Sequence, residues 1–150
     1  QPPTLIVPID RTQPDLVMGN SHIAQLDSTH ATLYNFEVPL SYEGETCNLV
    51  FFVPPESKDW FQPWHMNTPG GMVVSRLETI ATKFSSSSNV GVSRTTGAIN
   101  LLAPGQGHLV NSAPCEAGET VGYRADALGA LDLSYFQLTN PPSGLFMTVS

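Results

Sequence analysis

The sequence predicts an all-β protein, an antiparallel β-sandwich of the jelly-roll-like or immunoglobulin-like kind. Three observations support this fold class. The 13 Pro and 12 Gly residues divide the chain into short segments that are rich in β-branched and aromatic residues. Charged residues make up only 13% of the chain, whereas exposed helix faces are usually rich in Glu, Lys and Arg. The length of 150 residues suits one ordinary domain, so we expect residues 1–150 to form a single sandwich.

Eight or nine short strands are expected between these turn signals. The first covers residues 4–9, where Pro8 indicates an edge strand or a bulge because proline cannot donate a ladder hydrogen bond. The run 47–53 is the strongest strand signal, because it is almost continuously apolar, as expected in a sandwich core. The remaining strands are expected over residues 30–38, 72–77, 98–102, 108–112, 120–125, 131–139 and 144–149.

Three local predictions concern the connections. Residues 98–102 and 108–112 flank a Pro-Gly-Gln-Gly turn and are expected to pair as a hairpin. The segment 75–84 carries apolar residues at helical spacing, so a short helix or turn is expected there. The serine-rich run 85–89 is expected to be a flexible polar loop.

The charge pattern argues against two classes of partner. The formal net charge is −7, and the six Lys and Arg residues stand singly along the chain. Binding to nucleic acid or to an anionic membrane needs clustered basic residues. No apolar run approaches the roughly 20 residues that span a bilayer, so no transmembrane segment is expected.

An aromatic cluster provides the main candidate for a binding site. Trp60, Phe61 and Trp64 lie within five positions, beside polar residues that include Asp59 and His65. Flat rings beside polar groups can stack on sugar faces, so Trp60, Trp64 and His65 are the candidate ligand-binding residues. The alternative is that the indoles close one end of the hydrophobic core, since aromatic residues dominate core burial.

Catalytic and metal-binding patterns are weak. Six acidic residues lie in the first third of the chain: Asp10, Asp15, Asp27, Glu37, Glu43 and Glu45. Two of them could form a carboxylate pair for glycoside cleavage, although any sandwich exposes acidic residues on its loops. There is no Gly-x-Ser-x-Gly nucleophile motif, and the four histidines show no paired spacing. We therefore expect no catalytic residue, no cofactor and no metal site.

The two cysteines, Cys47 and Cys115, are 68 positions apart and form no Cys-x-x-Cys motif. The spacing alone leaves two possibilities open, a disulfide or two separate buried thiols. A disulfide would indicate an oxidising compartment and hence secretion.

Several segments together resemble the C-terminal domain of the fungal ubiquitin-three-binding, or But-type, proteins. They occur in the same order over nearly the whole chain, at residues 5–10, 34–39, 46–51, 113–118, 134–137 and 142–146. The resemblance implies an extracellular or cell-wall fungal protein, a β-sandwich, and a disulfide between Cys47 and Cys115. It brings no accepted catalytic residues. The stretch 59–65 is more aromatic than the resemblance leads us to expect.

The sequence therefore favours a secreted, non-catalytic binding domain associated with the cell wall or an extracellular surface. Its expected partner is a cell-wall polysaccharide, bound through Trp60, Trp64 and His65, or an extracellular protein. Two other functions remain open: a polysaccharide hydrolase with paired carboxylates, and an effector-like protein-interaction module.

Overall fold

The computed structural model describes residues 1–56 and 63–150. In these residues the chain is almost entirely β structure, with one 3-10 turn, η1 (Leu40–Tyr42), and every strand pairing is antiparallel. The all-β prediction is confirmed. The strands are β1 (Leu5–Asp10), β2 (Ile23–Leu26), β3 (His30–Glu37), β4 (Thr46–Phe52), β5 (Trp64–Thr68), β6 (Gly71–Leu77), β7 (Val92–Ile99), β8 (Gly107–Pro114), β9 (Thr120–Leu128), β10 (Asp132–Phe136), β11 (Leu138–Thr139) and β12 (Pro142–Val149).

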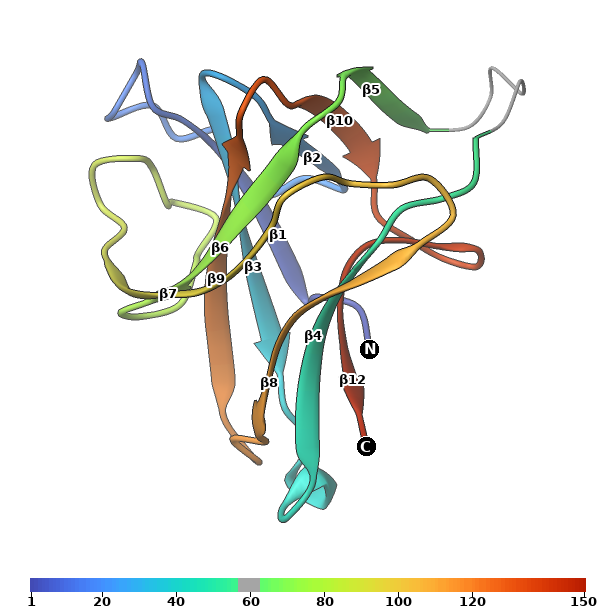
Figure 1. Ribbon diagram of the computed structural model, residues 1–150. Helices are drawn as coiled ribbons and strands as arrows, with labels where there is room; N and C mark the ends of the chain where they lie inside the picture. Colours follow the sequence, from blue (N-terminus) through green and yellow to red (C-terminus); the bar gives the residue numbers. More distant parts are fainter. Residues whose placement is uncertain (57–62) are drawn as a thin grey trace.

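The strands form three sheets. A five-stranded sheet has the order β1-β3-β9-β6-β7, and a four-stranded sheet has the order β11-β12-β4-β8. These two sheets are the layers of a sandwich-like structure, and a three-stranded sheet, β2-β10-β5, lies at the top of the view in Figure 1. Buried residues from all three sheets belong to one apolar cluster. The small sheet therefore closes one end of the main core.

Alternation along the strands explains how this core is filled. In β4, Cys47, Leu49 and Phe51 are buried while the residues between them are less so. Successive side chains of a strand point to opposite faces, so one face of β4 meets the opposite layer. At the centre, the hydroxyl groups of Tyr34 and Tyr135 are 2.7 Å apart and fully buried. This hydrogen bond satisfies both phenols inside the apolar core.

The outer face of the five-stranded sheet carries a second apolar cluster. Val7, Ile9, Ala31 and Leu33 point away from the main core, yet they are fully buried. The connection between β6 and β7, residues 78–91, covers them, because Ala81 belongs to the same cluster and Val90 packs against it. β3 is therefore buried on both faces, which is unusual for a strand in an antiparallel sandwich.

One side chain attaches this connection to the sheet. Asn35 on β3 is 4% exposed. Its amide group donates to the Ala81 carbonyl at 2.7 Å and its carbonyl accepts from the Ala81 N–H at 2.9 Å. Both backbone groups of Ala81 are thus paired although the loop is buried at this point.

Three local predictions are wrong in whole or in part. Residues 98–102 and 108–112 do not pair as a hairpin: β7 pairs with β6 and β8 pairs with β4, so the turn between them crosses from one layer to the other. Of the short helix or turn expected over 75–84, the helix is absent, because β6 continues to Leu77 and the rest is the covering loop, whereas a turn is present at residues 83–84. The serine run is not a free polar loop, since Ser85 and Ser86 are buried and hydrogen-bonded within it.

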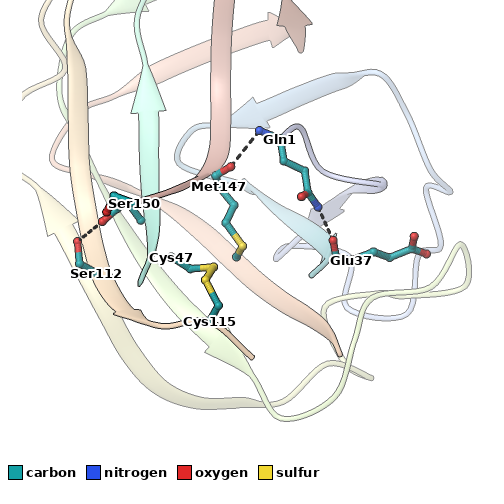
Figure 2. Close-up of a disulfide and its surroundings, with 8 residues drawn as sticks. Gln1, Glu37, Cys47, Ser112, Cys115, Met147 and Ser150 are labelled. Carbon is teal, nitrogen blue, oxygen red and sulfur yellow. Dashed lines mark hydrogen bonds between the residues drawn. A yellow bond between two sulfur atoms is a disulfide. The ribbon is translucent and has the colours of Figure 1, made fainter. Parts of the chain in front are cut away.

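The predicted disulfide is confirmed. Cys47 on β4 bonds to Cys115, which follows β8, so the bond closes a stretch of 68 positions. Figure 2 shows the bond beside Met147, and Gln1 donates from its amino group to the Met147 carbonyl at 2.9 Å. The predicted edge position of Pro8 is also confirmed, because β1 is the outermost strand of its sheet.

Candidate ligand-binding site

The three-stranded sheet β2-β10-β5 has one face on the core and one face toward solvent. On the core face, the cross-strand row of Ala24, Tyr135 and Trp64 packs into the main cluster. On the outer face, the row consists of Gln25, Ser134 and His65. Side chains in such a row lie about 5 Å apart at their Cβ atoms. The outer face therefore presents three neighbouring polar groups.

An aromatic element borders this polar row. The His22 ring stacks on Phe136, with 5.6 Å between ring centroids and an interplanar angle of 28°. Ile23, the register partner of Phe136, is 44% exposed. The outer face thus combines a partly exposed ring with hydrogen-bonding side chains.

A cleft of about 440 Å³ lies at the other end of the same sheet. Three chain segments form it: the turn between β2 and β3, the end of β5, and the turn between β9 and β10. Most of the lining residues are polar or small; they are Asp27, Ser28, Thr29, Thr68, Gly129, Ala130, Leu131 and Asp132. Thr68 and Asp132 are register partners beside an irregularity in the ladder between Asp132 and Leu133, so strand pairing brings these two residues to the same end of the sheet.

The Asp27 carboxylate organises the first of these turns. It accepts hydrogen bonds from the N–H groups of Thr29 at 2.9 Å and His30 at 2.7 Å. Partial burial acts to raise the pKa of Asp27, but these hydrogen bonds and the nearby His30 ring outweigh it, so the pKa lies below its ordinary value. Asp27 is therefore ionised at neutral pH, and its turn is rigidly held.

His30 stands between two carboxylates beside the cleft. Its Nδ1 lies 3.0 Å from Asp27 Oδ1, and its Nε2 lies 3.8 Å from Asp10 Oδ2. Hydrogen bonds from the hydroxyl and amide of Thr12 lower the pKa of Asp10 below its ordinary value. Two of the six acids singled out in the sequence are thus brought together around one histidine.

The family comparison agrees with the architecture. The family described as "Ubiquitin 3 binding protein But2 C-terminal domain" matches residues 1–141. The chain belongs to this family. A search of curated proteins found no significant match.

The residues predicted for binding have different positions in this But2 C-terminal domain. Trp60 lies outside the described residues. The Trp64 ring is partly buried, 5.1 Å from the Tyr135 ring and 6.1 Å from the Phe51 ring by centroid. His65 is exposed on the outer face. Ligand binding by Trp60, Trp64 and His65 stays a prediction.

The cleft of this family member was only partly visible in the sequence. Asp27 was among the candidate acids, but Thr68, Ala130 and Asp132 were not singled out. The two small residues 129–130 indicate a turn after β9. They do not indicate which other segments of the chain that turn packs against. Bringing Thr68 beside Asp132 depends on the pairing of β5 with β10, which residue types alone do not specify.

Within residues 1–56 and 63–150, no three His, Cys, Asp or Glu side chains converge as metal ligands would. In the same part of the chain, no helix is long and apolar enough to cross a membrane.

Proposed function

We propose that the chain is a secreted, non-catalytic binding domain that holds a hydroxyl-rich ligand, a cell-wall polysaccharide, at the three-stranded end of the sandwich. The observation that carries this proposal is the open polar cleft of about 440 Å³, whose lining combines carboxylates with the hydroxyl groups of Thr29 and Thr68. Ionised carboxylates accept hydrogen bonds strongly, and hydroxyl groups both donate and accept, as sugar hydroxyls require.

The outer face of the small sheet extends the proposed binding surface. Its polar row consists of Gln25, Ser134 and His65, and the partly exposed Phe136 lies beside the row, two residues along β10 from Ser134. A polymer lying in the cleft can continue along this face, so that several sugar units are contacted on rigid strands and short turns. In this arrangement Trp64 supports the site from within the core.

Binding without cleavage is favoured by the state of the carboxyl groups. A glycosidase needs a general acid whose pKa is raised. Among the described residues, the three carboxyl groups with clearly displaced pKa values, Asp10, Asp27 and Glu116, are all shifted downward. Of these, Asp27 lines the cleft, where it serves as an acceptor.

Secretion is supported by the disulfide between β4 and the end of β8. Such bonds persist in oxidising compartments and are rare in the cytosol. A polysaccharide of the cell wall would be accessible there.

A protein partner is the second candidate function. The family description names a protein that binds ubiquitin 3. Leu101 and Leu109, near the connection between β7 and β8, are 59% and 60% exposed. Exposed leucines of this kind suit a protein contact better than a sugar contact.

Retention of the purified protein on insoluble chitin, β-glucan and cellulose tests the proposal. We expect retention without released sugar, and its loss in Ala130→Trp, because Ala130 lines the cleft and is exposed. The matched control is Ala113→Trp, an exposed alanine of β8 paired with Cys47 in another sheet. Equal retention of both variants, or release of soluble sugar, would contradict the proposal.

A further inference from the structure

The charge of the cleft points to a particular class of sugar polymer. Among residues 1–56 and 63–150, Asp27 and Asp132 are the ionisable residues that line it, and no Lys or Arg of that part of the chain does so. The lowered pKa of Asp27 keeps that carboxylate ionised well below neutral pH. A ligand in the cleft therefore meets negative charge together with hydroxyl groups.

Two basic residues of this region, Arg11 and Arg124, are engaged by the same carboxylate, Asp126. Arg11 donates to the Asp126 carboxylate at 2.7 Å and to the main-chain carbonyl of Asp27 at 2.8 Å. Arg124 also binds Asp126, with Nε 2.9 Å from Oδ2. Asp126 thus balances one of these two guanidinium charges.

The remaining groups leave this region negative. Asp10, on the far side of His30, adds another carboxylate. Four carboxylates and two guanidinium groups give these groups a net charge of two negative. The overall charge of −7 has the same sign. Such a region attracts cations and repels acidic ligands.

We infer that the cleft selects an amino-sugar polymer with free ammonium groups, such as deacetylated chitin, over neutral and acidic polysaccharides. The inference rests on the proposed function, because it assigns the ligand of the same cleft. The sugar hydroxyls bind Thr29 and Thr68, and an ammonium group binds between Asp27 and Asp132. Charge-assisted hydrogen bonds of this kind are stronger than neutral ones.

The test compares soluble oligomers of equal length and linkage by isothermal titration calorimetry. The probes are a glucosamine oligomer with its amines protonated, an N-acetylglucosamine oligomer and a galacturonate oligomer. We expect the glucosamine oligomer to bind about tenfold more tightly than its acetylated counterpart, the effect of one to two partly screened charge pairs. The galacturonate oligomer should bind most weakly.

Variants separate the cleft from the overall charge. Asp132→Asn should reduce the preference to about threefold, and Ala130→Lys should abolish it, since both changes make the cleft less negative. The control, Glu43→Gln with Glu45→Gln, removes two exposed charges near η1, at the opposite end of the molecule in Figure 1. It should keep the full preference. Because Ala130 is exposed and Asp132 is only half-buried, circular dichroism of each variant should match the wild type.

Each outcome decides one question. Equal binding of the cationic and neutral oligomers, both lost in Ala130→Trp, would overturn the charge selection and leave the proposed cleft intact. A preference lost in the Glu43 and Glu45 control but kept in Asp132→Asn would assign it to the overall charge and overturn the inference. No binding of any oligomer would overturn the proposed function and this inference with it.

Discussion

Replacing Asn35 with Ala should detach the covering loop from the outer face of the five-stranded sheet. The Asn35 side chain makes two hydrogen bonds, at 2.7 and 2.9 Å, to the carbonyl and N–H of Ala81. Ala81 is 2% exposed and belongs to the second apolar cluster. The substitution therefore leaves two buried backbone groups without partners.

The expected cost follows from those two groups. An unsatisfied buried donor or acceptor costs about 1–3 kcal/mol, so the two groups together should lower the free energy of unfolding of Asn35→Ala by about 2–6 kcal/mol. The lower bound applies if the loop moves outward and water reaches Ala81. Outward movement would in turn expose part of the apolar surface of Val7 and Leu33.

Urea unfolding measures the loss, and amide hydrogen exchange locates it. The Ala81 N–H should be protected in the wild type and exchange rapidly in Asn35→Ala. The control is Asn48→Ala, because Asn48 also lies in a strand but bonds the exposed side chains of Ser112 and Ser150. It should cost less than about 1 kcal/mol. A similar small loss for Asn35→Ala, with unchanged exchange at Ala81, would show that the two Asn35 hydrogen bonds do not hold the loop on the sheet.

Four further changes test other parts of the structure. Tyr34→Phe and Tyr135→Phe should each lower the free energy of unfolding by about 1–3 kcal/mol, because each change removes the hydrogen-bond partner of a buried hydroxyl group. The double variant should lose less than the sum of the two. Additive losses would show that the two hydroxyl groups do not interact. Trp64→Ala should cost about 3 kcal/mol, measured by thermal unfolding, whereas unchanged stability with lost glycan retention would show that the indole is a binding platform. The pKa of Asp27 is lowered in the folded protein, so its contribution to the free energy of unfolding is present above the unfolded pKa of about 4 and is lost as pH falls below that value. Asp27→Asn should therefore flatten the loss of stability in an acid titration. An unaltered profile would show that the hydrogen bonds of Asp27 do not stabilise the turn. Reducing the disulfide should cost about 4 kcal/mol by the chain-entropy relation for 68 positions, and an unchanged urea midpoint would contradict this.

The strands that could be predicted from the sequence are those with long β-branched or aromatic runs. β1, β3, β4, β6, β9 and β12 all fall on such runs. β2 and β5 were missed because they are short: β2 has only four residues, and three of the five residues of β5 are polar. Their positions depend on pairing with β10, which is a long-range contact.

The wrong local predictions share a cause. Turn chemistry after β7 indicates that the chain reverses, but not that the next strand joins the opposite layer. The apolar spacing over 75–84 fits a helix, yet the same residues cover the sheet because Asn35 pairs Ala81. A polar residue in a strand does not reveal, from the sequence alone, which distant loop it will bind.

The candidate site shows the same limit. The residue types of the sequence indicated a binding site in the aromatic stretch 59–65. In the structure, Trp64 of this stretch packs against the core and His65 lies on the outer face of the small sheet. The cleft arises from three turns far apart in the chain, and the importance of Asp132 depends on its register with Thr68. Such a site is set by the sheet pairing and not by a local motif.

The most direct test of the account is the titration of isotope-labelled protein with a short glucosamine oligomer, followed by amide chemical shifts. We predict that the largest shifts occur in residues 27–29, at Thr68 and in residues 129–132, with smaller shifts along the outer face of β10. Shifts concentrated instead on β8 or around η1, or none at a ligand concentration that saturates retention on the solid polymer, would contradict the claim that this cleft binds the glycan.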